Sequence, residues 1–370
     1  MVKIKVLHLF TTLDAGGVES FLYNYYINIK EEIQFDFIVP GNSIGFYEKE
    51  LSNYGSKIFH VPLLKKSPVS QISQIYKIMK SNKYDIIHCH GYKSFIGLII
   101  GFLCGCKVRI LHSHMVYVNE SRYQILIRKF TMLIANLFLT EKFACGIDAA
   151  KFLFGKKEYE KGNVRVINNA VDIDKFKFNV LSRNTIRDEF KISNDTFLLG
   201  NIGRLTYQKN QEFLLDLAKI FKDNKSNIKT ILIGEGEDYN NLLQAIEKEC
   251  LHDYVLLVGK RKDIPDILSA IDLFILPSRF EGLPVVLAEV QAAGLKSLVA
   301  NTITKEINVT DSIEYLSLKS GTDVWINRIY ELKEESYDRE KVALKMKDTK
   351  FDLKKQAVNL INIYYNLVKG

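Results

Sequence analysis

Short apolar runs alternate with segments of helical period along the first half of the chain, and this alternation constrains the fold more than any other feature. A stripe at helical spacing follows the first run: Val18, Phe21, Leu22, Tyr25, Tyr26 and Ile29. The runs that we predict as strands are residues 3–10, 35–39, 57–61, 85–89, 107–112, 142–145 and 164–167. Strands that are separated by helices favour a parallel, doubly wound α/β sheet.

The same alternation restarts in the second half of the chain. The further strands that we predict are residues 197–201, 230–233, 254–258, 273–276 and 297–299. A chain of 370 residues is also long for a single domain. The segment 172–195 is polar and weakly periodic, which suits a crossing between domains. We therefore predict two α/β domains with a boundary near Asp172.

A candidate ligand site follows the predicted strand 273–276. Glu281 and Gly282 fall in the loop after this strand, and Pro284 suits the first position of a helix, where no amide hydrogen is needed. The free N–H groups and positive dipole end of such a helix can hold a diphosphate, and Gly282 permits a close approach of the main chain. The alternative is a capped helix with two solvated glutamates, Glu281 and Glu289.

A second candidate site follows the predicted strand 197–201. Gly203 and Arg204 come directly after it, and Lys209 precedes a helical stripe. Two cations could reach one diphosphate, with arginine as a planar fork and lysine as a mobile point charge. In isolation a solvated pair of cations is the better explanation of these residues, because Arg and Lys are abundant in this chain.

Four of the seven histidines form two His-x-His pairs at the ends of predicted strands. His88 and His90 make one pair and His112 and His114 the other, and side chains two residues apart in a strand share a face. Ligands of open α/β sheets bind beyond the carboxyl ends of the strands, so both pairs point to a cleft. Two such pairs could bind zinc, but no carboxylate downstream completes a catalytic site, and we predict no metal.

In their order along the chain, these segments resemble the motifs of glycosyltransferase family 4, the retaining sugar-nucleotide transferases of the GT-B architecture. The resemblance covers nearly the whole chain. The segments that carry it are 16–19 (Gly-Gly-Val-Glu), 85–90, 112–114 (His-Ser-His), 168–172, 203–205 with 209–210, 234–236 and 277–289.

The resemblance implies two facing Rossmann-like domains, each a doubly wound parallel sheet, with a cleft between them. Residues 1–172 would form the acceptor-binding domain and residues 173–351 the nucleotide-sugar donor domain. A C-terminal helix in residues 352–370 would return to the first domain.

The resemblance also implies roles for individual residues. His114 would contact the donor sugar and Glu281 would orient its hydroxyl groups, while Glu289 would bind the ribose. The other expected donor-binding residues are Gly17, Arg204, Lys209, Gly282, Leu283, Pro284 and Val285. No cofactor is expected. Asp172 and Asp174 form an Asp-x-Asp pattern that binds Mn²⁺ in another transferase architecture, but their setting resembles a linker of the family, so we predict metal independence.

The activity that the resemblance implies is retaining transfer of a sugar from a nucleotide sugar, with UDP as the expected nucleotide. The acceptor would be a saccharide or an undecaprenyl-type lipid-linked saccharide of capsule or exopolysaccharide biosynthesis. Two alternatives are a GT-B-like sugar-nucleotide epimerase, which would make product without an acceptor, and a non-catalytic sugar-nucleotide binding protein, which would not need Glu281, Glu289, Arg204 and Lys209 together.

Composition limits the compartment. Five cysteines are an odd number without zinc-ribbon or redox spacing, which favours the cytoplasm. No signal peptide is predicted, because His8 interrupts the first apolar run. The longest uncharged apolar run, 95–106, is shorter than the ~20 residues of a membrane span.

The net charge of +8 is unevenly distributed. Residues 1–170 hold 22 Lys and Arg against 13 Asp and Glu, and the rest of the chain holds 29 against 30. No nucleic-acid-binding motif accompanies this excess, so we expect a peripheral position at the inner face of the plasma membrane, on an anionic surface. A stripe in 125–139 would form a half-buried helical face there: Leu126, Phe130, Leu133, Ile134, Leu137 and Phe138. The alternative is that this stripe is core.

Overall fold

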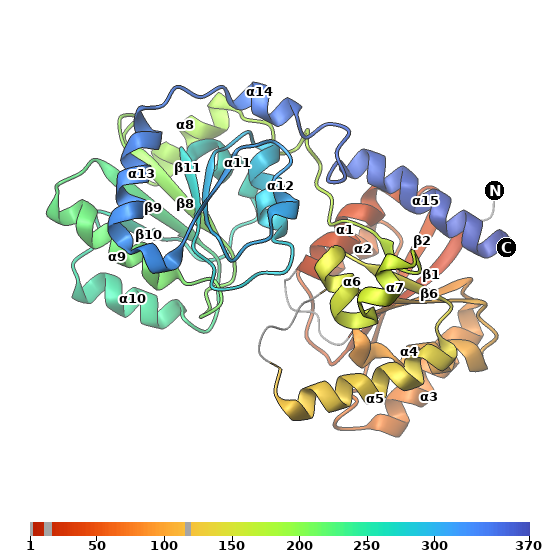
Figure 1. Ribbon diagram of the computed structural model, residues 1–370. Coiled ribbons are helices and arrows are strands. Elements are labelled where there is room, and N and C mark those ends of the chain that lie inside the picture. Colours follow the sequence, from red (N-terminus) through yellow and green to blue (C-terminus); the bar gives the residue numbers. More distant parts are fainter. Residues whose placement is uncertain (1–2, 11–16, 115–119) are drawn as a thin grey trace. The chain divides into compact units, whose positions relative to one another are not determined.

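The computed structural model describes residues 3–10, 17–114 and 120–370, which form two compact units. Unit 1 contains Met1–Ala170 and Leu353–Gly370, and unit 2 contains Val171–Asp352. Figure 1 shows each unit as a sheet with helices on both faces.

Unit 1 is built on a seven-stranded sheet of order β3-β2-β1-β4-β5-β6-β7 in which every pair is parallel. Its strands are β1 (Ile4–Leu9), β2 (Ile33–Pro40), β3 (Ile58–Val61), β4 (Ile86–His90), β5 (Val108–Ser113), β6 (Glu141–Ala144) and β7 (Arg165–Val166). Each overlaps a run predicted as a strand, so the predicted α/β class with a parallel sheet is confirmed for this half.

Helices cover both faces of this sheet and bury two separate apolar cores. One core lies under α1 (Gly17–Ile29), α2 (Glu48–Asn53) and the C-terminal helix α15 (Leu353–Lys369). The other lies under α3 (Pro68–Asn82), α4 (Ile96–Leu103), α5 (Arg122–Phe138) and α6 (Ile147–Phe154). The short elements η1 (Tyr92–Ser94) and α7 (Lys156–Glu160) complete the unit.

Unit 2 has a six-stranded parallel sheet of order β10-β9-β8-β11-β12-β13. Its strands are β8 (Phe197–Ile202), β9 (Ile228–Ile233), β10 (Val255–Leu257), β11 (Leu273–Leu276), β12 (Ser297–Ala300) and β13 (Ile313–Leu316). The edge strand β13 was not predicted, because its four residues are mostly half-exposed and lack a continuous apolar run.

The helices of unit 2 also divide between the two faces of its sheet. One core lies under α8 (Val180–Glu189), α11 (Ile264–Ala270), α12 (Val285–Ala292) and α14 (Arg339–Leu344). The other lies under α9 (Gln211–Asp223), α10 (Tyr239–Lys248) and α13 (Thr322–Glu334). The remaining elements are η2 (Lys305–Ile307) and η3 (Leu318–Ser320).

The polar segment 172–195 is not only a crossing. It contains α8, and Ile173, Phe176, Ile186 and Ile192 are buried in the core of unit 2. Its few apolar residues are spaced too widely to reveal this packing in the sequence. None of the described helices combines the length and apolar character that a bilayer crossing requires.

Each sheet has one switch point, a pair of neighbouring strands from which the chain continues toward opposite edges of the sheet. In unit 1 this point lies between β1 and β4, and in unit 2 it lies between β8 and β11. The loops at the carboxyl ends of such a pair diverge, and the crevice between them is where open α/β sheets bind ligands.

Candidate active site

The two loops at the switch point of unit 2 contain most of the predicted donor site. One loop follows β8 and holds Arg204 and Lys209, and the other follows β11 and holds Glu281 and Gly282. Asn210 Nδ2 donates to the carbonyl of Pro277 over 3.0 Å, and the Arg279 amide donates to the carbonyl of Gln208 over 2.8 Å. These bonds connect the loops and bring the two predicted segments together.

Lys209 and Glu281 form an ion pair at the centre of this site. The Lys209 ammonium lies 2.6 Å from Glu281 Oε1, and the two side chains are 15% and 6% exposed. Ser278 Oγ donates to the same oxygen over 2.7 Å, and Gln208 Nε2 donates to Oε2 over 3.2 Å. Because both carboxylate oxygens accept hydrogen bonds, the carboxylate is held in one orientation. The ammonium keeps further N–H donors for a ligand.

Arg204 differs from Lys209 in its surroundings. Its side chain is exposed, while its carbonyl accepts a bond of 3.2 Å from Gln211 Nε2, which anchors the loop to the start of α9. The aliphatic stem of Lys209 packs over Gly203. A Cβ atom added to Gly203 would lie 3.3 Å from Lys209 Cε. The structure therefore places one ion-paired and one exposed cation in the same loop.

Helix α12 begins beside this pair. Its first residue is Val285, and Pro284 is the N-cap with φ −72° and ψ 105°, so the helix starts one residue later than we predicted. The extended ψ of Pro284 turns the chain into the helix and leaves the first amides without acceptors inside the helix. Leu283 and Val285 pack against the core of unit 2, which holds the helix start in place.

The glycines near this site are needed for different physical reasons. A Cβ on Gly282 would meet nothing within 4 Å, so the space beside it is open. A Cβ on Gly234 would lie 1.9 Å from the Gly203 carbonyl oxygen, and one on Gly236 would lie 2.1 Å from the Leu205 carbonyl oxygen. The Gly234 to Gly236 turn is thus required for packing of the loops after β8 and β9.

We expect Gly282→Ala to weaken nucleotide-sugar binding about tenfold without lowering the unfolding midpoint, because its methyl group fills ligand space and touches no protein atom. Gly234→Ala is the matched contrast. It should destabilise the protein by several kcal/mol, roughly the cost of overpacking added to that of a positive φ. Calorimetric titration and urea unfolding of both variants test the difference. Normal nucleotide-sugar affinity in Gly282→Ala would argue against a ligand at this loop.

Glu289 lies on α12, one helical turn past its start. Burial raises the pKa of its carboxyl group to about 7, and the charge of Lys175 offsets part of this effect. A carboxylate accepts hydrogen bonds from two ribose hydroxyls, whereas its protonated form loses an acceptor.

If Glu289 binds the ribose, as the family resemblance implies, the affinity for a UDP-sugar should fall about tenfold between about pH 8 and about pH 6, as Glu289 takes up its proton. A UDP-sugar is the suitable ligand because its diphosphate does not titrate in this range. In Glu289→Gln the affinity should be lower and independent of pH. Titration calorimetry at each pH provides the measurement, and an unchanged pH profile in Glu289→Gln would exclude this role.

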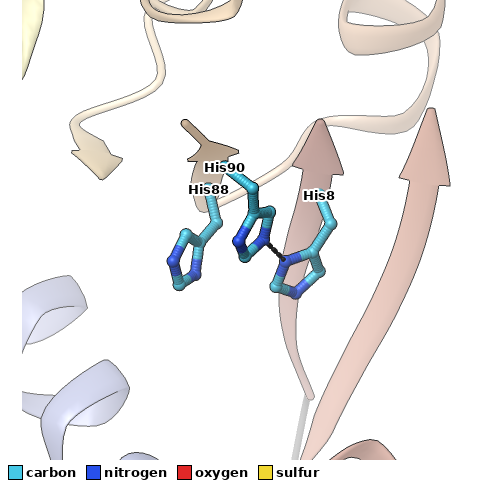
Figure 2. A group of neighbouring side chains, drawn as sticks. All are labelled: His8, His88 and His90. Atoms are coloured by element: carbon cyan, nitrogen blue, oxygen red, sulfur yellow. Dashed lines mark hydrogen bonds between the residues drawn. The ribbon is translucent and has the colours of Figure 1, made fainter. Parts of the chain in front are cut away.

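In unit 1 the parallel register assembles a group of five histidines at the carboxyl ends of three strands. His8 of β1 lies beside His88 of β4, and His90 of β4 lies beside His112 of β5. His114 follows β5 directly. Figure 2 shows the rings of His8, His88 and His90 projecting from β1 and β4 next to one another.

The five rings form two hydrogen-bonded chains. In one, His88 Nδ1 lies 2.8 Å from the Tyr364 hydroxyl of α15, and His88 Nε2 lies 3.1 Å from His112 Nδ1. In the other, His8 Nδ1 lies 2.9 Å from His90 Nε2, and His90 Nδ1 lies 2.8 Å from His114 Nε2. Three end nitrogens have no hydrogen-bond partner among residues 3–10, 17–114 and 120–370: His8 Nε2, His112 Nε2 and His114 Nδ1.

Burial decides the charge of these rings. His8, His88, His90 and His112 are at most 4% exposed, and desolvation holds the pKa of each well below its ordinary value. Desolvation lowers the pKa of His114 to about 3, although this side chain is partly exposed. All five are neutral at pH 7. The interpretation of His88, His90 and His112 as cleft wall is wrong, because they lie inside the core under α1 and α15.

Two groups of three histidines have the composition of a metal site: His8, His88 and His90, and His90, His112 and His114. In each group one nitrogen per ring lies within 4.8 Å of the others. Ring nitrogens at hydrogen-bond distance share a proton, and a cation would displace these protons. Only the end nitrogens could therefore bind a metal without breaking the hydrogen bonds between the rings. Asp172 is also engaged, since its Oδ1 accepts from the Asp174 and Lys175 amides.

Several site residues were missed in the sequence. His8 and Tyr364 complete the histidine chains, and Ser278 and Gln208 hold Glu281. The position of His8 near the end of a predicted strand was a usable signal. Tyr364 carried none, because only the packing of α15 brings it to β4. Gly17 is the first residue of α1, and its neighbour Gly16 lies outside the described residues.

Two doubly wound units, each with polar groups at its switch point, are the architecture that the resemblance to glycosyltransferase family 4 implies. Residues 15–175 match the family model described as Glycosyltransferase Family 4, and residues 182–341 match that described as Glycosyl transferases group 1. The chain therefore belongs to glycosyltransferase family 4 and has the GT-B fold.

The relatives of known name point the same way. The chain is 29% identical to the putative glycosyltransferase EpsF of Bacillus subtilis, over 88% of this chain and 86% of EpsF. It is 28% identical to the Escherichia coli UDP-Gal:alpha-D-GlcNAc-diphosphoundecaprenol alpha-1,3-galactosyltransferase, over 81% of this chain and 80% of that enzyme. It is 26% identical to the capsular polysaccharide biosynthesis glycosyltransferase CapH of Staphylococcus aureus, over 77% and 78%.

Among solved structures, HepE of Anabaena in complex with UDP-glucose superposes with a TM-score of 0.78 at 19% identity, covering 99% of each chain. At this identity the match supports the fold alone.

Proposed function

We propose that this protein transfers a sugar, with retention of its anomeric configuration, from a UDP-sugar to a saccharide or undecaprenyl-type lipid-linked saccharide in capsule or exopolysaccharide synthesis. The observation that carries the proposal is the Lys209–Glu281 pair beside the start of α12 and the exposed Arg204. The donor and acceptor classes are supported by the printed names of the relatives, one of which specifies UDP-Gal and a diphosphoundecaprenol acceptor.

The proposed step breaks the bond between the anomeric carbon and the diphosphate oxygen and forms a bond from that carbon to an acceptor hydroxyl. The acceptor proton passes to the departing diphosphate oxygen on the same face of the sugar, so configuration is retained. Lys209, Arg204 and the amides at the start of α12 stabilise the charge that develops on the diphosphate.

The remaining residues orient the donor. Glu281 is held by Ser278 and Gln208 and accepts hydrogen bonds from sugar hydroxyls, and Glu289 accepts from the ribose. Gly17 at the start of α1, with Gly282, Leu283, Pro284 and Val285, would line the donor. His114 contacts the sugar as a neutral ring, since its pKa of about 3 excludes a cation at neutral pH. If His90 Nδ1 donates to His114 Nε2, the His114 proton lies on Nδ1, which has no partner in the described part of the chain.

A panel of nucleotide sugars, screened first by thermal shift and then incubated with a lipid-linked saccharide, tests the proposal. NMR of the product should show the anomeric configuration of the donor. Inversion would refute the retaining step. A changed sugar nucleotide formed without acceptor would identify an epimerase, and binding without turnover on any acceptor would identify a binding protein.

We expect transfer to be independent of metal ions, because Asp172 caps a local turn and Asp174 pairs with Lys177 at 2.9 Å. Activity should therefore be the same with and without EDTA. The measurement is the initial rate after chelation, with elemental analysis of the chelated protein as the control for complete removal. Loss of activity that Mn²⁺ or Zn²⁺ restores would contradict this expectation.

A further inference from the structure

The outer face of α3, α4 and α5 in unit 1 exposes an unusual number of large apolar side chains. On α5 the stripe is Tyr123, Leu126, Phe130, Leu133 and Leu137, exposed by 72, 65, 62, 67 and 76%. Spacings of three and four residues place these five side chains on one side of the helix. The buried residues of α5 are Thr131, Met132 and Ala135. The alternative that this stripe is core is therefore wrong for Leu126, Phe130, Leu133 and Leu137, and the expected half-buried face is in fact open.

The apolar surface continues from α5 onto its neighbours. Phe102 of α4 is 54% exposed, and its ring lies 5.5 Å from that of Phe138 of α5. Leu103 is 60% exposed, and on α3, which packs against α4, Tyr76 is 40% exposed. Figure 1 shows these three helices together on one side of unit 1. Apolar patches of this extent on one surface mark interaction sites.

The segment that contains these helices and the loops between them carries the excess positive charge of the chain. Residues 62–140 hold eleven Lys and Arg against two Asp and Glu, an excess of +9, while the chain as a whole carries +8. Helices α3, α4 and α5 contain no acidic residue. Among the eleven cations, only Arg128 has an acidic partner within the described part of the chain, Glu120 at 2.8 Å.

We propose that this surface, which we call the α3–α5 face, docks on an anionic lipid bilayer with the α5 stripe inserted among the lipid headgroups. An apolar stripe flanked by lysine and arginine without acids is the composition of a helix that lies in a membrane interface. A second copy of the chain fits poorly, because a symmetric contact would place one set of cations against the same set. A bilayer supplies both the apolar layer and the negative charge.

This placement deepens the proposed function, because it would bring unit 1 to the surface that carries a lipid-linked acceptor. That use of the face rests on the transferase assignment. Binding to lipid does not, since it depends only on the α3–α5 face.

Co-sedimentation with vesicles of phosphatidylcholine, alone or mixed with phosphatidylglycerol, tests the proposal at low and high salt. We expect binding only to the anionic vesicles, with release at high salt. Replacing Lys77, Lys80, Lys107 and Lys129 together by Gln should weaken binding at low salt at least a hundredfold. The matched control replaces four exposed lysines of unit 2, Lys225, Lys248, Lys319 and Lys333, and should bind as the unaltered protein does.

A second variant addresses the apolar stripe. Replacing Leu126, Phe130, Leu133 and Leu137 by Gln changes only exposed side chains, so the protein should fold normally and lose most of its vesicle binding. Transfer to a water-soluble acceptor analogue should continue in both variants. Failure of that reaction in every form of the protein would count against the proposed function and leave the lipid result standing.

Three outcomes would overturn the docking proposal. They are no binding of the unaltered protein at low salt, equal loss in the unit 2 control, and normal binding of the stripe variant. If the protein does not bind vesicles but forms a dimer in solution, and the stripe variant abolishes that dimer, a second copy covers this face.

Discussion

Lys209→Ala is expected to lower kcat/KM by a factor of a hundred to a thousand. The loss of one preorganised charge from the leaving group costs about 2 to 4 kcal/mol in transition-state stabilisation. Arg204→Ala should fall near the lower end of this range, because its side chain is exposed and solvent screens it. Steady-state kinetics with saturating acceptor provide the measurement. Lys219→Ala removes an exposed ammonium paired with Asp216 on α9 of the same unit and should leave the rate unchanged.

The double variant separates chemistry from stability. Lys209→Ala alone leaves the 6%-exposed Glu281 carboxylate without its cation, which destabilises a buried site by about 3 to 5 kcal/mol. Removing Glu281 as well should restore part of the unfolding free energy, while activity stays as low as in the single variant. A double variant with activity within about tenfold of the unaltered enzyme would mean that the pair is structural and that the leaving group is stabilised elsewhere.

Unit 1 is expected to lose stability steeply below pH 6.5, the ordinary pKa of histidine. Burial lowers the pKa of His8, His88, His90, His112 and His114 in the folded protein. The unfolded chain therefore binds more protons than the folded one. The contribution of these groups to stability is complete above pH 6.5 and declines as the pH falls below it. One pH unit below its unfolded pKa, each histidine has lowered the free energy of unfolding by about 1.4 kcal/mol. The five together lower it there by roughly 7 kcal/mol.

Urea unfolding followed by circular dichroism at a series of pH values measures this dependence. The slope of unfolding free energy against pH gives the number of protons taken up. His8→Phe should reduce that number by about one, because phenylalanine takes up no proton. The new ring should fit this position, because Phe35 and Phe37 already pack around the His8 ring. A flat profile between neutral and mildly acidic pH would mean that the buried rings accept protons without unfolding.

The sequence alone was sufficient for most of the secondary structure and for the prediction that the loops of the candidate site lie together. Twelve of the thirteen strands in the described part of the chain were predicted, because a strand buried on both faces is a continuous apolar run between turn residues. The exception, β13, is an edge strand with half-exposed side chains. The site loops could be located because parallel strands present their carboxyl ends at one edge, so residues directly after β8 and β11 had to lie near each other if those strands were neighbours.

The partners of the site residues could not be read from the sequence. Arg204 and Lys209 were expected to reach one diphosphate, as a planar fork and a mobile point charge, yet Lys209 is held in an ion pair with Glu281. That pairing depends on the left-handed turn at Asn210, with φ 59°, and on its bond to Pro277. A contact across 72 residues has no local signal in a single sequence. The same holds for Tyr364, which reaches His88 from the last helix.

The sequence by itself determined the class of most segments, the parallel α/β class of both halves and the positions of the charged loops, because these follow from periodicity and residue type. Only the tertiary structure decided which side of each helix and strand is covered. The α5 stripe and the histidine pairs have similar local patterns of side chains on one face. The stripe lies outside and the histidines lie in the core, because α1 and α15 cover one surface and no described element covers the other. Burial depends on neighbours that are distant in the chain, and periodicity does not specify them.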